Sequence, residues 1–391
     1  MRIALMVSGF EDGGVERTMA NLAAGLAALG AQVDLLSGRT DHPYLRALPP
    51  EVGLRVLRGG DEALAAYLDA RRPDLMMTGK RVDDRAALSV RARLGLPVRL
   101  VATVGTPLSL SVSAKRFNPF RTSRERRRIR ADYRLLDGIT AVSDAVADDL
   151  RQHFGVLDVP LRVLPNPIVP TDLAARAAAP CPHPWLASRP DPEPDSNSDP
   201  EAVLEPGSRR GSPRPPVILA IGGLRKVKDF ATLVRAFALL PAALDARLLV
   251  LGEGKERPRL TALAERLGVA DRVDLHGFVE DPFPYLARAR LLVLSSRREG
   301  LSNVLVEAMA TGTPVAATDC PGGVRDLLAQ GDRGPLTPVG DAGALAGSIA
   351  HLLQSPTDAQ TLRRAAEPYG LLTASRRYLE FFEQIVAGGA R

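Results

Sequence analysis

Short hydrophobic runs alternate along this chain with segments whose apolar residues repeat at the spacing of a helix. In the first part of the chain, runs that predict buried strands cover residues 3–7, 33–36, 75–78, 100–104 and 139–142. A second series covers residues 217–221, 248–251, 273–275, 291–294 and 315–317. The best-marked helix follows Gly13 and Gly14 and ends at Gly30. This alternation predicts two α/β units, each with a parallel, doubly wound sheet.

The two series are separated by a stretch of different composition. Residues 180–216 are rich in Pro, Ser, Asp and Arg and show no periodicity, which predicts a disordered or extended linker or a surface insertion. We therefore expect a first domain over residues 1–170, a linker over 171–216, a second domain over 217–368 and a C-terminal helix in 369–391.

Composition narrows the class of protein. The chain has 391 residues and is 45% hydrophobic, which suits two globular domains. Cys181 and Cys320 are too few for a disulfide framework and lack the spacing of a zinc site, which indicates a reducing compartment. The apolar run at the start is too short for a signal peptide, and no stretch approaches the roughly 18 apolar residues of a membrane span. We expect a cytoplasmic protein.

Candidate chemistry centres on two glutamates, Glu299 and Glu307, which are separated by seven residues. The run 291–294 predicts a strand, and Asn303 to Thr311 predicts a helix that is capped by Ser302 or Asn303 and ends before Gly312. Glu299 then lies on the connecting loop and Glu307 inside an almost wholly apolar helix. A buried carboxylate is costly without a partner, so Glu307 requires one.

A strand, a short loop and a helix start together form an anion site, because the free N–H groups of the first turn point beyond the strand. The amides of Gly300, Leu301, Ser302 and Asn303 would hold a nucleotide diphosphate. Glu307 would then accept hydrogen bonds from the ribose, and Glu299 would face the transferred group. The alternative is a solvent-facing polar stripe with an ordinary loop acid. The pair alone supports both interpretations equally.

Each predicted domain opens with a strand and a glycine-bearing loop. Gly13 and Gly14 would let a ligand approach the backbone, or they form a simple tight turn. In the second loop, Arg225, Lys226 and Lys228 would neutralise a diphosphate, or they are solvated surface charges. Neither loop has the spacing of the dinucleotide fingerprint, which argues against a nicotinamide oxidoreductase.

These motifs resemble the retaining glycosyltransferases of family 4, which have the two-domain GT-B fold with Rossmann-like domains. The resemblance spans nearly the whole chain and is strongest from Val217 to Gly323. Its most specific element is the glutamate pair with Gly300 and Asn303 in their usual places. Gly-Gly-Val-Glu-Arg at 13–17 is similar to the family's glycine loop, and Lys228 matches its donor-phosphate lysine. Phe278 corresponds to the segment that contacts the base, and residues 369–382 resemble the helix that crosses back to the first domain.

The resemblance implies transfer of a sugar from a nucleotide sugar, with uridine donors favoured, to a hydroxyl of a glycan or lipid-linked glycan, with retention. We assign Glu299, Lys228 and Arg225 to the reaction, with the cations on the diphosphate. Gly13, Gly14, Gly300 to Asn303, Glu307 and Phe278 bind the donor. The leaving phosphate oxygen is thought to take the acceptor's proton in this class. Without an Asp-x-Asp motif in a folded segment, we expect no metal and no separate cofactor.

Two positions depart from the family pattern. Gly223 stands where an arginine is usual, and Arg225 is positioned to replace it. Gly105 stands where the first domain usually carries a histidine. Two alternatives stay open. One is a sugar-nucleotide epimerase of the same fold, and the other, which these two glycines suggest, is a catalytically silent binding or scaffold subunit.

A basic segment concerns the acceptor side. Lys115 to Arg130 contains eight basic residues and one acid, with Phe117, Phe120 and Ile129 between them. Such a segment fits peripheral contact with an anionic membrane at its inner face, although nucleic-acid binding uses the same residue types and the pI near 9.6 does not separate them. A solvated basic helix is the third interpretation. Because the family often works on lipid-linked glycans, we favour the membrane and expect no nucleic acid as a partner.

Overall fold

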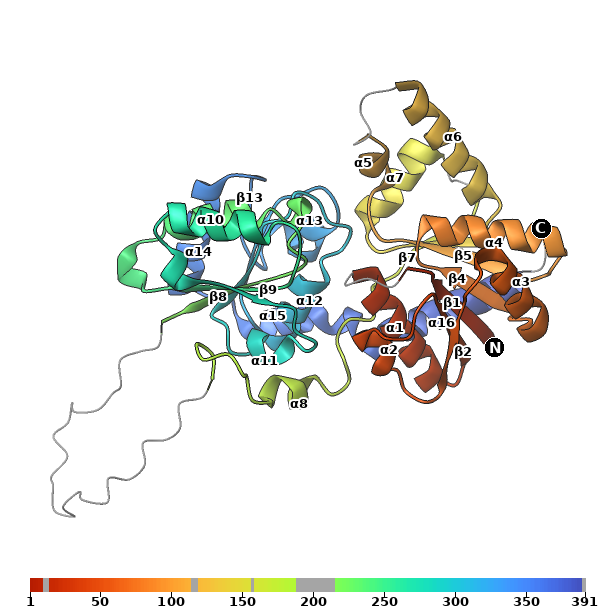
Figure 1. Cartoon of the computed structure of the whole chain (residues 1–391), viewed down its shortest axis with the longest axis horizontal. Helices are drawn as coiled ribbons and strands as arrows, with labels where there is room; N and C mark the ends of the chain where they lie inside the picture. Colours follow the sequence, from red (N-terminus) through yellow and green to blue (C-terminus); the bar gives the residue numbers. More distant parts are fainter. Residues whose placement is uncertain (10–13, 114–118, 156–157, 188–214, 389–391) are drawn as a thin grey trace, which may run out of the picture.

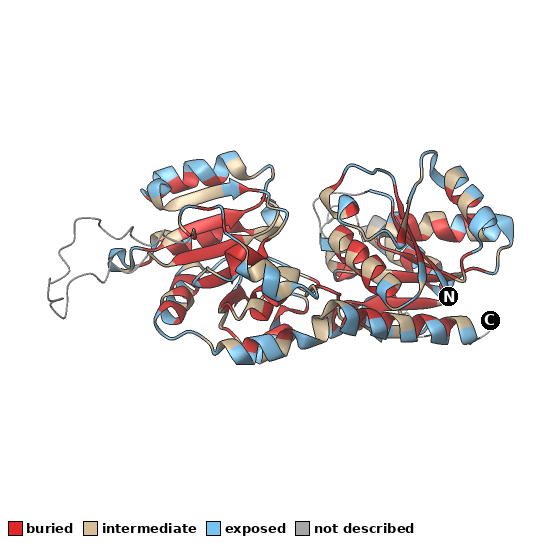
Figure 2. Ribbon diagram, turned by 90° about the horizontal axis from the view of Figure 1, so that it is seen from below, coloured by how far each residue is buried: buried red, intermediate tan, exposed pale blue. Residues whose placement is uncertain are grey.

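The computed structural model describes residues 1–9, 14–113, 119–155, 158–187 and 215–388. Two parallel sheets lie side by side along the long axis of the molecule, each flanked by helices (Figure 1). Buried residues concentrate on the strands in the middle of each unit, whereas the outer faces of the helices are exposed (Figure 2). This is the two-domain, Rossmann-like GT-B architecture that the sequence predicts.

The first sheet has seven strands, all parallel to their neighbours. In the order in which they lie across the sheet, they are β3 (Val52–Val56), β2 (Gln32–Ser37), β1 (Arg2–Val7), β4 (Leu75–Thr78), β5 (Arg99–Val104), β6 (Gly138–Ala141) and β7 (Leu161–Val163). The helices of this part are α1 (Gly14–Ala28), α2 (Pro43–Arg46), α3 (Gly60–Arg71), α4 (Arg81–Leu94), α5 (Leu108–Ser113), α6 (Pro119–Arg134), α7 (Asp144–Phe154) and α8 (Leu173–Ala178).

The second sheet has six parallel strands. Their order is β10 (Val273–Gly277), β9 (Arg247–Leu251), β8 (Val217–Ile221), β11 (Leu291–Leu294), β12 (Val315–Thr318) and β13 (Leu336–Thr337). The helices are η1 (Lys226–Lys228), α9 (Phe230–Ala238), η2 (Ala242–Leu244), α10 (Arg257–Arg266), η3 (Ala270–Arg272), α11 (Phe283–Leu286), α12 (Asn303–Thr311), α13 (Val324–Leu327), η4 (Ala329–Gly331), α14 (Ala342–Gln354), α15 (Ala359–Ala366), η5 (Glu367–Tyr369) and α16 (Leu371–Ala387).

The strand order places a switch point in each sheet. The chain moves outward from β1 to β2 and β3 and then returns to the other side of β1 with β4; β8 and β11 repeat this arrangement in the second sheet. Loops that leave neighbouring strands at a switch point diverge and form a crevice at the carboxyl edge. The start of α1 at Gly14 and the glycine-bearing loop after β8 therefore lie where a ligand binds in this class of fold.

All ten predicted strands are present, with ends within two residues of the predicted ones. The helix predicted from Asn303 to Thr311 has those bounds in the structure. Three strands were not predicted: β3 and β7 have mostly half-exposed residues, and β13 has two residues. Such strands lack the continuous apolar run by which a buried parallel strand is recognised.

Two segments, residues 181–187 and the final helix α16, pack against the domains and connect them. Residues 181–187 are irregular, as their composition suggests, but they are packed, with Cys181, His183 and Leu186 buried against the second sheet. The final helix α16 lies against α1, and its Tyr378 and Phe382 are part of the core of the first domain. The C-terminal chain thus crosses from the second domain to the first (Figures 1 and 2).

Candidate functional site

The loops after β8 and β11 lie side by side because these strands are neighbours in the sheet. The Nζ atom of Lys228 lies 2.6 Å from Oε1 of Glu299, and Ser296 Oγ donates to the same oxygen at 2.6 Å. Ser295 Oγ donates to the carbonyl of Lys228 at 2.8 Å. The predicted cation and the predicted loop acid therefore form a partly buried ion pair at the carboxyl edge of the sheet.

The start of α12 faces the same region. Ser302 occupies the N-cap position, but its side chain makes no capping hydrogen bond and its buried Oγ has no partner among the described residues. The N–H groups in the first turn of a helix lack intrahelical acceptors, and the helix dipole adds positive potential there. This end of α12 can therefore bind an anion, as the sequence predicts.

Glu307 lies in the second turn of α12 and is fully buried. Its Oε1 lies 2.6 Å from Nη1 of Arg17, which belongs to α1 of the other domain. Burial raises the pKa of Glu307 above its ordinary value. The charge of Arg17 lowers this pKa, but burial is the larger effect. Neither carboxylate oxygen accepts an aligned hydrogen bond within the described chain. Arg17 is thus the partner that Glu307 requires, and a ligand hydroxyl could satisfy the remaining oxygen.

Further polar contacts join the two domains around α12. The side chain of Asn303 lies 3.3 Å from Thr18 Oγ1, and its Oδ1 accepts a hydrogen bond from Asn166 at 3.0 Å. Ser143 Oγ donates to the carbonyl of Gly300 at 3.1 Å. The amino end of α12 is therefore bound directly to the first domain, so the donor-side loop and the opposite domain share one interface.

A cavity of about 380 Å³ lies at this interface, and we call it the interdomain cavity. It brings together every predicted site residue within the described chain; Gly13 lies outside the described residues. The predicted residues that line it are Gly14, Arg225, Lys228, Phe278, Glu299, Gly300, Leu301, Ser302, Asn303 and Glu307. Residues that the sequence did not assign to the site include Arg17, Thr18, Tyr44 and Asn166.

The unassigned residues come from the first domain. Arg17 is the last residue of the Gly-Gly-Val-Glu-Arg motif. The motif indicated a glycine loop, but it did not indicate which side chain faces Glu307. Thr18 follows it in the same helix, and Asn166 follows β7. Their roles depend on contacts between residues more than 100 positions apart, which no local pattern encodes.

The structure shows what surrounds each of the two glycines that depart from the family pattern. A Cβ atom at Gly223 would lie 3.2 Å from Nε of Arg225, so the Arg225 side chain occupies the space beside this glycine. Gly105 lies at the domain interface, where its carbonyl oxygen would be only 1.7 Å from a Cβ atom at Gly300. The Arg225 side chain therefore lies beside the glycine that stands in place of the usual arginine, and Gly105 is part of the contact between the domains.

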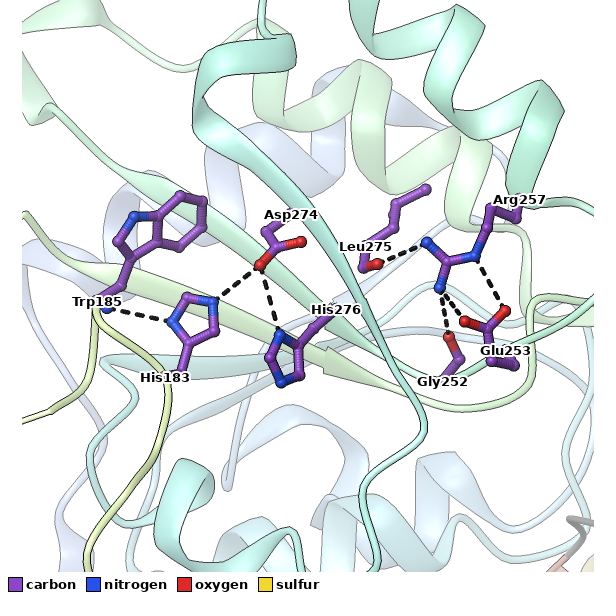
Figure 3. Close-up of polar contacts among 8 residues, drawn as sticks. All are labelled: His183, Trp185, Gly252, Glu253, Arg257, Asp274, Leu275 and His276. Atoms are coloured by element: carbon purple, nitrogen blue, oxygen red, sulfur yellow. Dashed lines mark hydrogen bonds and ion pairs between the residues drawn. The ribbon is translucent and has the colours of Figure 1, made fainter.

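Phe278 follows β10 and is partly exposed at the wall of the interdomain cavity. Arg257 stabilises the neighbouring strand ends, because its guanidinium donates to the carbonyl of Leu275 at 2.6 Å and pairs with Glu253 (Figure 3). An exposed aromatic ring at a rigid strand end can stack on a base.

The basic segment is only partly described. Residues 114–118, including Phe117, lie outside the described residues, and the side chain of Phe120 is likewise not described. Ile129 is fully buried in the core of the first domain, so it is not part of the exposed surface of this segment. The helical period turns Ile129 inward while Arg124, Arg127 and Arg128 are exposed. Within the described chain, no helix is both long and apolar enough to cross a membrane.

Three side chains on and beside β10 have the composition of a metal site. The donor atoms of His183, Asp274 and His276 lie within 4.8 Å of one another (Figure 3). However, the backbone N–H of Trp185 donates to Nδ1 of His183 at 3.2 Å, while Nε2 lies 2.9 Å from Asp274 Oδ2. This arrangement places a proton on Nε2, so that atom has no lone pair for a metal ion. His183 instead fastens residues 181–187 to β10.

Comparison with known proteins agrees with this geometry. Residues 12–172 match the family model described as Glycosyltransferase Family 4, and residues 215–355 match the model described as Glycosyl transferases group 1. A Rhizobium meliloti protein named lipopolysaccharide core biosynthesis glycosyltransferase LpsE is 38% identical over 35% of this chain and 39% of its own length.

Another relative comes from Campylobacter jejuni and is named N-acetylgalactosamine-N,N'-diacetylbacillosaminyl-diphospho-undecaprenol 4-alpha-N-acetylgalactosaminyltransferase. It is 35% identical over 35% of this chain and 37% of its own length. The matches therefore span less than half the length of these two curated relatives.

Among solved structures, Anabaena HepE in complex with UDP and glucose superposes with a TM-score of 0.72, at 18% identity, covering 98% of this chain and all of that one. At this identity the likeness shows the fold alone. The two family models together match most of the chain, one in each domain, and the glutamate motif lies within the second. The chain thus belongs to the family 4 glycosyltransferases of GT-B fold.

Proposed function

We propose that the protein transfers a sugar from a nucleotide diphosphate sugar to a hydroxyl of a glycan or lipid-linked glycan, with retention at the anomeric carbon. One observation carries the proposal: the Lys228–Glu299 pair, the open amino end of α12 and the buried Glu307 all line the interdomain cavity. Together they offer cations and amides for a diphosphate and carboxylates for sugar hydroxyls.

The proposed reaction separates charge, because the diphosphate leaves with negative charge as the sugar ring becomes positive. Lys228, Arg225 and the amides of Gly300 to Asn303 stabilise the leaving group, and Glu299 orients the sugar. Glu307 binds the ribose through the oxygen that Arg17 leaves free. The leaving phosphate oxygen takes the proton of the acceptor, so no separate protein base is needed.

The similar proteins support our choice of donor and acceptor class. HepE was crystallised with UDP and glucose, which makes a uridine donor our first choice. The names of the Rhizobium and Campylobacter proteins refer to lipopolysaccharide core and to a diphospho-undecaprenol-linked sugar. We therefore favour a role in the assembly of cell-surface polysaccharide or glycolipid on the cytoplasmic side.

The proposal also holds that transfer needs no metal ion. The cations Lys228 and Arg225 line the interdomain cavity and can neutralise a diphosphate there, and His183 is already engaged by Trp185 and Asp274. Activity that is lost with EDTA and restored with Mg²⁺ or Mn²⁺ would contradict this part of the proposal.

The central test is Glu307→Gln, assayed with a panel of nucleotide sugars and calorimetric titration of UDP. Loss of the ribose-binding carboxylate should weaken UDP binding by about 1–3 kcal/mol, which corresponds to roughly five- to 150-fold, and should lower transfer at least as much. Wild-type activity in this variant would contradict the assignment. A nucleotide sugar converted to an isomer without any acceptor would instead identify an epimerase.

We further propose that exposed α6 arginines contact an anionic membrane surface. Arg124, Arg127 and Arg128 form no ion pair within the described chain, and each cation near an anionic surface adds about 1 kcal/mol. In flotation experiments at low salt, the protein should rise with vesicles of anionic lipid and not with neutral ones. Equal flotation of a triple Arg→Gln variant at these positions would contradict this role.

A further inference from the structure

A second pocket, of about 670 Å³, lies beside the interdomain cavity and shares Arg225 and Val227 with it. Its floor is formed by η1 and the first turn of α9, and the start of α10 contributes one wall. Arg297, Arg298 and Pro321 contribute another wall, and Leu110 of α5 faces them from the first domain. We call this the basic pocket because of the charges described next.

Cationic side chains predominate in the lining of the basic pocket. Two of its arginines are paired, since Arg297 lies 2.9 Å from Asp229 and Arg259 lies 2.8 Å from Glu256. These are the two acids of the lining. The remaining four cations form no ion pair with any described residue: Arg225, Lys226, Arg235 and Arg298.

The four unpaired cations are exposed, and together around one hollow they give it a positive potential that attracts anions. Guanidinium groups bind the oxygens of phosphate and carboxylate in a bidentate manner. The amino end of the nine-residue helix α9 at the pocket floor adds partial positive charge. The chemistry of the pocket is therefore that of an oxyanion site.

The pocket shares one residue, Arg225, with the groups assigned to the donor diphosphate. The other groups assigned to the diphosphate are Lys228 and the amides of Gly300 to Asn303, and none of these lines the basic pocket. Arg298, in contrast, directly precedes Glu299, which faces the transferred sugar in the proposed reaction. An acceptor whose hydroxyl reaches that sugar can place its neighbouring groups beside Arg298.

We infer that the basic pocket binds an oxyanion of the acceptor, either phosphate or carboxylate, and thereby selects acceptors that carry negative charge near the reacting hydroxyl. Arg235 and Arg298 contact the oxyanion, and Arg225 lies between it and the donor diphosphate. This inference rests on the proposed transfer reaction, because it names the class of acceptor for that reaction.

The test uses inorganic pyrophosphate as the probe, titrated calorimetrically into the full chain at low salt in the presence of saturating UDP. UDP fills the donor site, so pyrophosphate that still binds must use another site. We compare the wild type with the double variant Arg235→Gln/Arg298→Gln and with the matched control Arg266→Gln. Arg266 is an exposed arginine of α10 that does not line the basic pocket.

The double variant should bind pyrophosphate at least ten-fold more weakly, whereas the control and the wild type should agree. UDP affinity should stay within two-fold in all three proteins. Equal pyrophosphate affinity in all three proteins, no binding to the wild type, or competition between pyrophosphate and UDP would overturn the inference. Failure of UDP to bind would instead count against the proposed function, and titration without UDP would then still test the pocket.

Discussion

At the scale of single residues, burial decides which charges matter. Glu307 stands in an apolar helix, and this alone predicts that it needs a partner, but only the folded chain identifies Arg17. Gly223 shows the same limit. The sequence shows that the usual arginine is absent there, but only the structure shows that the Arg225 side chain lies beside this glycine. Residue type and local burial can be read from a sequence, but the identity of a distant partner cannot.

Asp84 provides a pH-dependent prediction at this scale. It is buried in the first turn of α4, and burial raises its pKa to about 7, although Thr78 Oγ1 donates to it at 2.6 Å. A folded-state pKa above the unfolded value of 3.8 favours the protonated form in the native protein. The raised pKa of Asp84 therefore contributes folding stability that is fully present below the unfolded pKa and is lost as the pH rises through about 7.

We therefore expect the stability difference between Asp84→Asn and the wild type to change by about 2–4 kcal/mol between pH 4 and pH 8, in favour of the variant at high pH. Urea unfolding at several pH values measures this difference. Asp148→Asn, an exposed acid in α7, is the control and should show little such change. A pH-independent difference for Asp84→Asn would contradict the assignment.

At the scale of elements, the hydrophobic pattern predicted the strands and the helix that are mostly buried. The central strands β1, β4, β8 and β11 are continuous apolar runs, and α12 has clear start and stop signals, so their bounds follow from the chain itself. The strands β3, β7 and β13 pair at or near sheet edges and are partly exposed. Their pairing depends on a neighbouring strand rather than on their own sequence.

Helix α6 shows that composition alone does not give the orientation of a helix. The excess of basic residues is plain in the sequence, but composition does not show on which face of the helix Ile129 lies. In the structure Ile129 lies in the core, next to Tyr133 one turn later, whereas Arg124, Arg127 and Arg128 are exposed. Orientation depends on which face packs against the rest of the domain.

At the scale of the whole molecule, the site exists only because two domains meet. Gly300 illustrates this, because a Cβ atom there would lie 1.7 Å from the carbonyl oxygen of Gly105 in the other domain. No backbone turn explains this glycine, since its φ angle is not positive. It is required for close approach of the donor loop to the first domain.

We therefore predict that Gly300→Ala separates the domains at this point. The unavoidable overlap should cost about 1–3 kcal/mol in the free energy of unfolding, and UDP binding should weaken, because the contacts around Asn303 are lost. Denaturant unfolding and calorimetry with UDP measure both effects.

Gly347→Ala is the matched control. A Cβ atom at Gly347 meets nothing within 4 Å, and the residue lies inside α14. Alanine should stabilise this helix by about 0.5–1 kcal/mol and leave UDP binding unchanged. If the two substitutions had the same effect, Gly300 would not be a contact glycine.

The sequence by itself determined the two α/β domains, the central strands, the helix that carries Glu307 and the chemical character of the loops around it. These features depend on local periodicity, caps and composition, which are written in consecutive residues. Only the tertiary structure decided that Arg17 meets Glu307, that Gly105 and Gly300 touch, and that four unpaired cations share one pocket. Each of these depends on the approach of distant segments, which is fixed by packing of the whole chain.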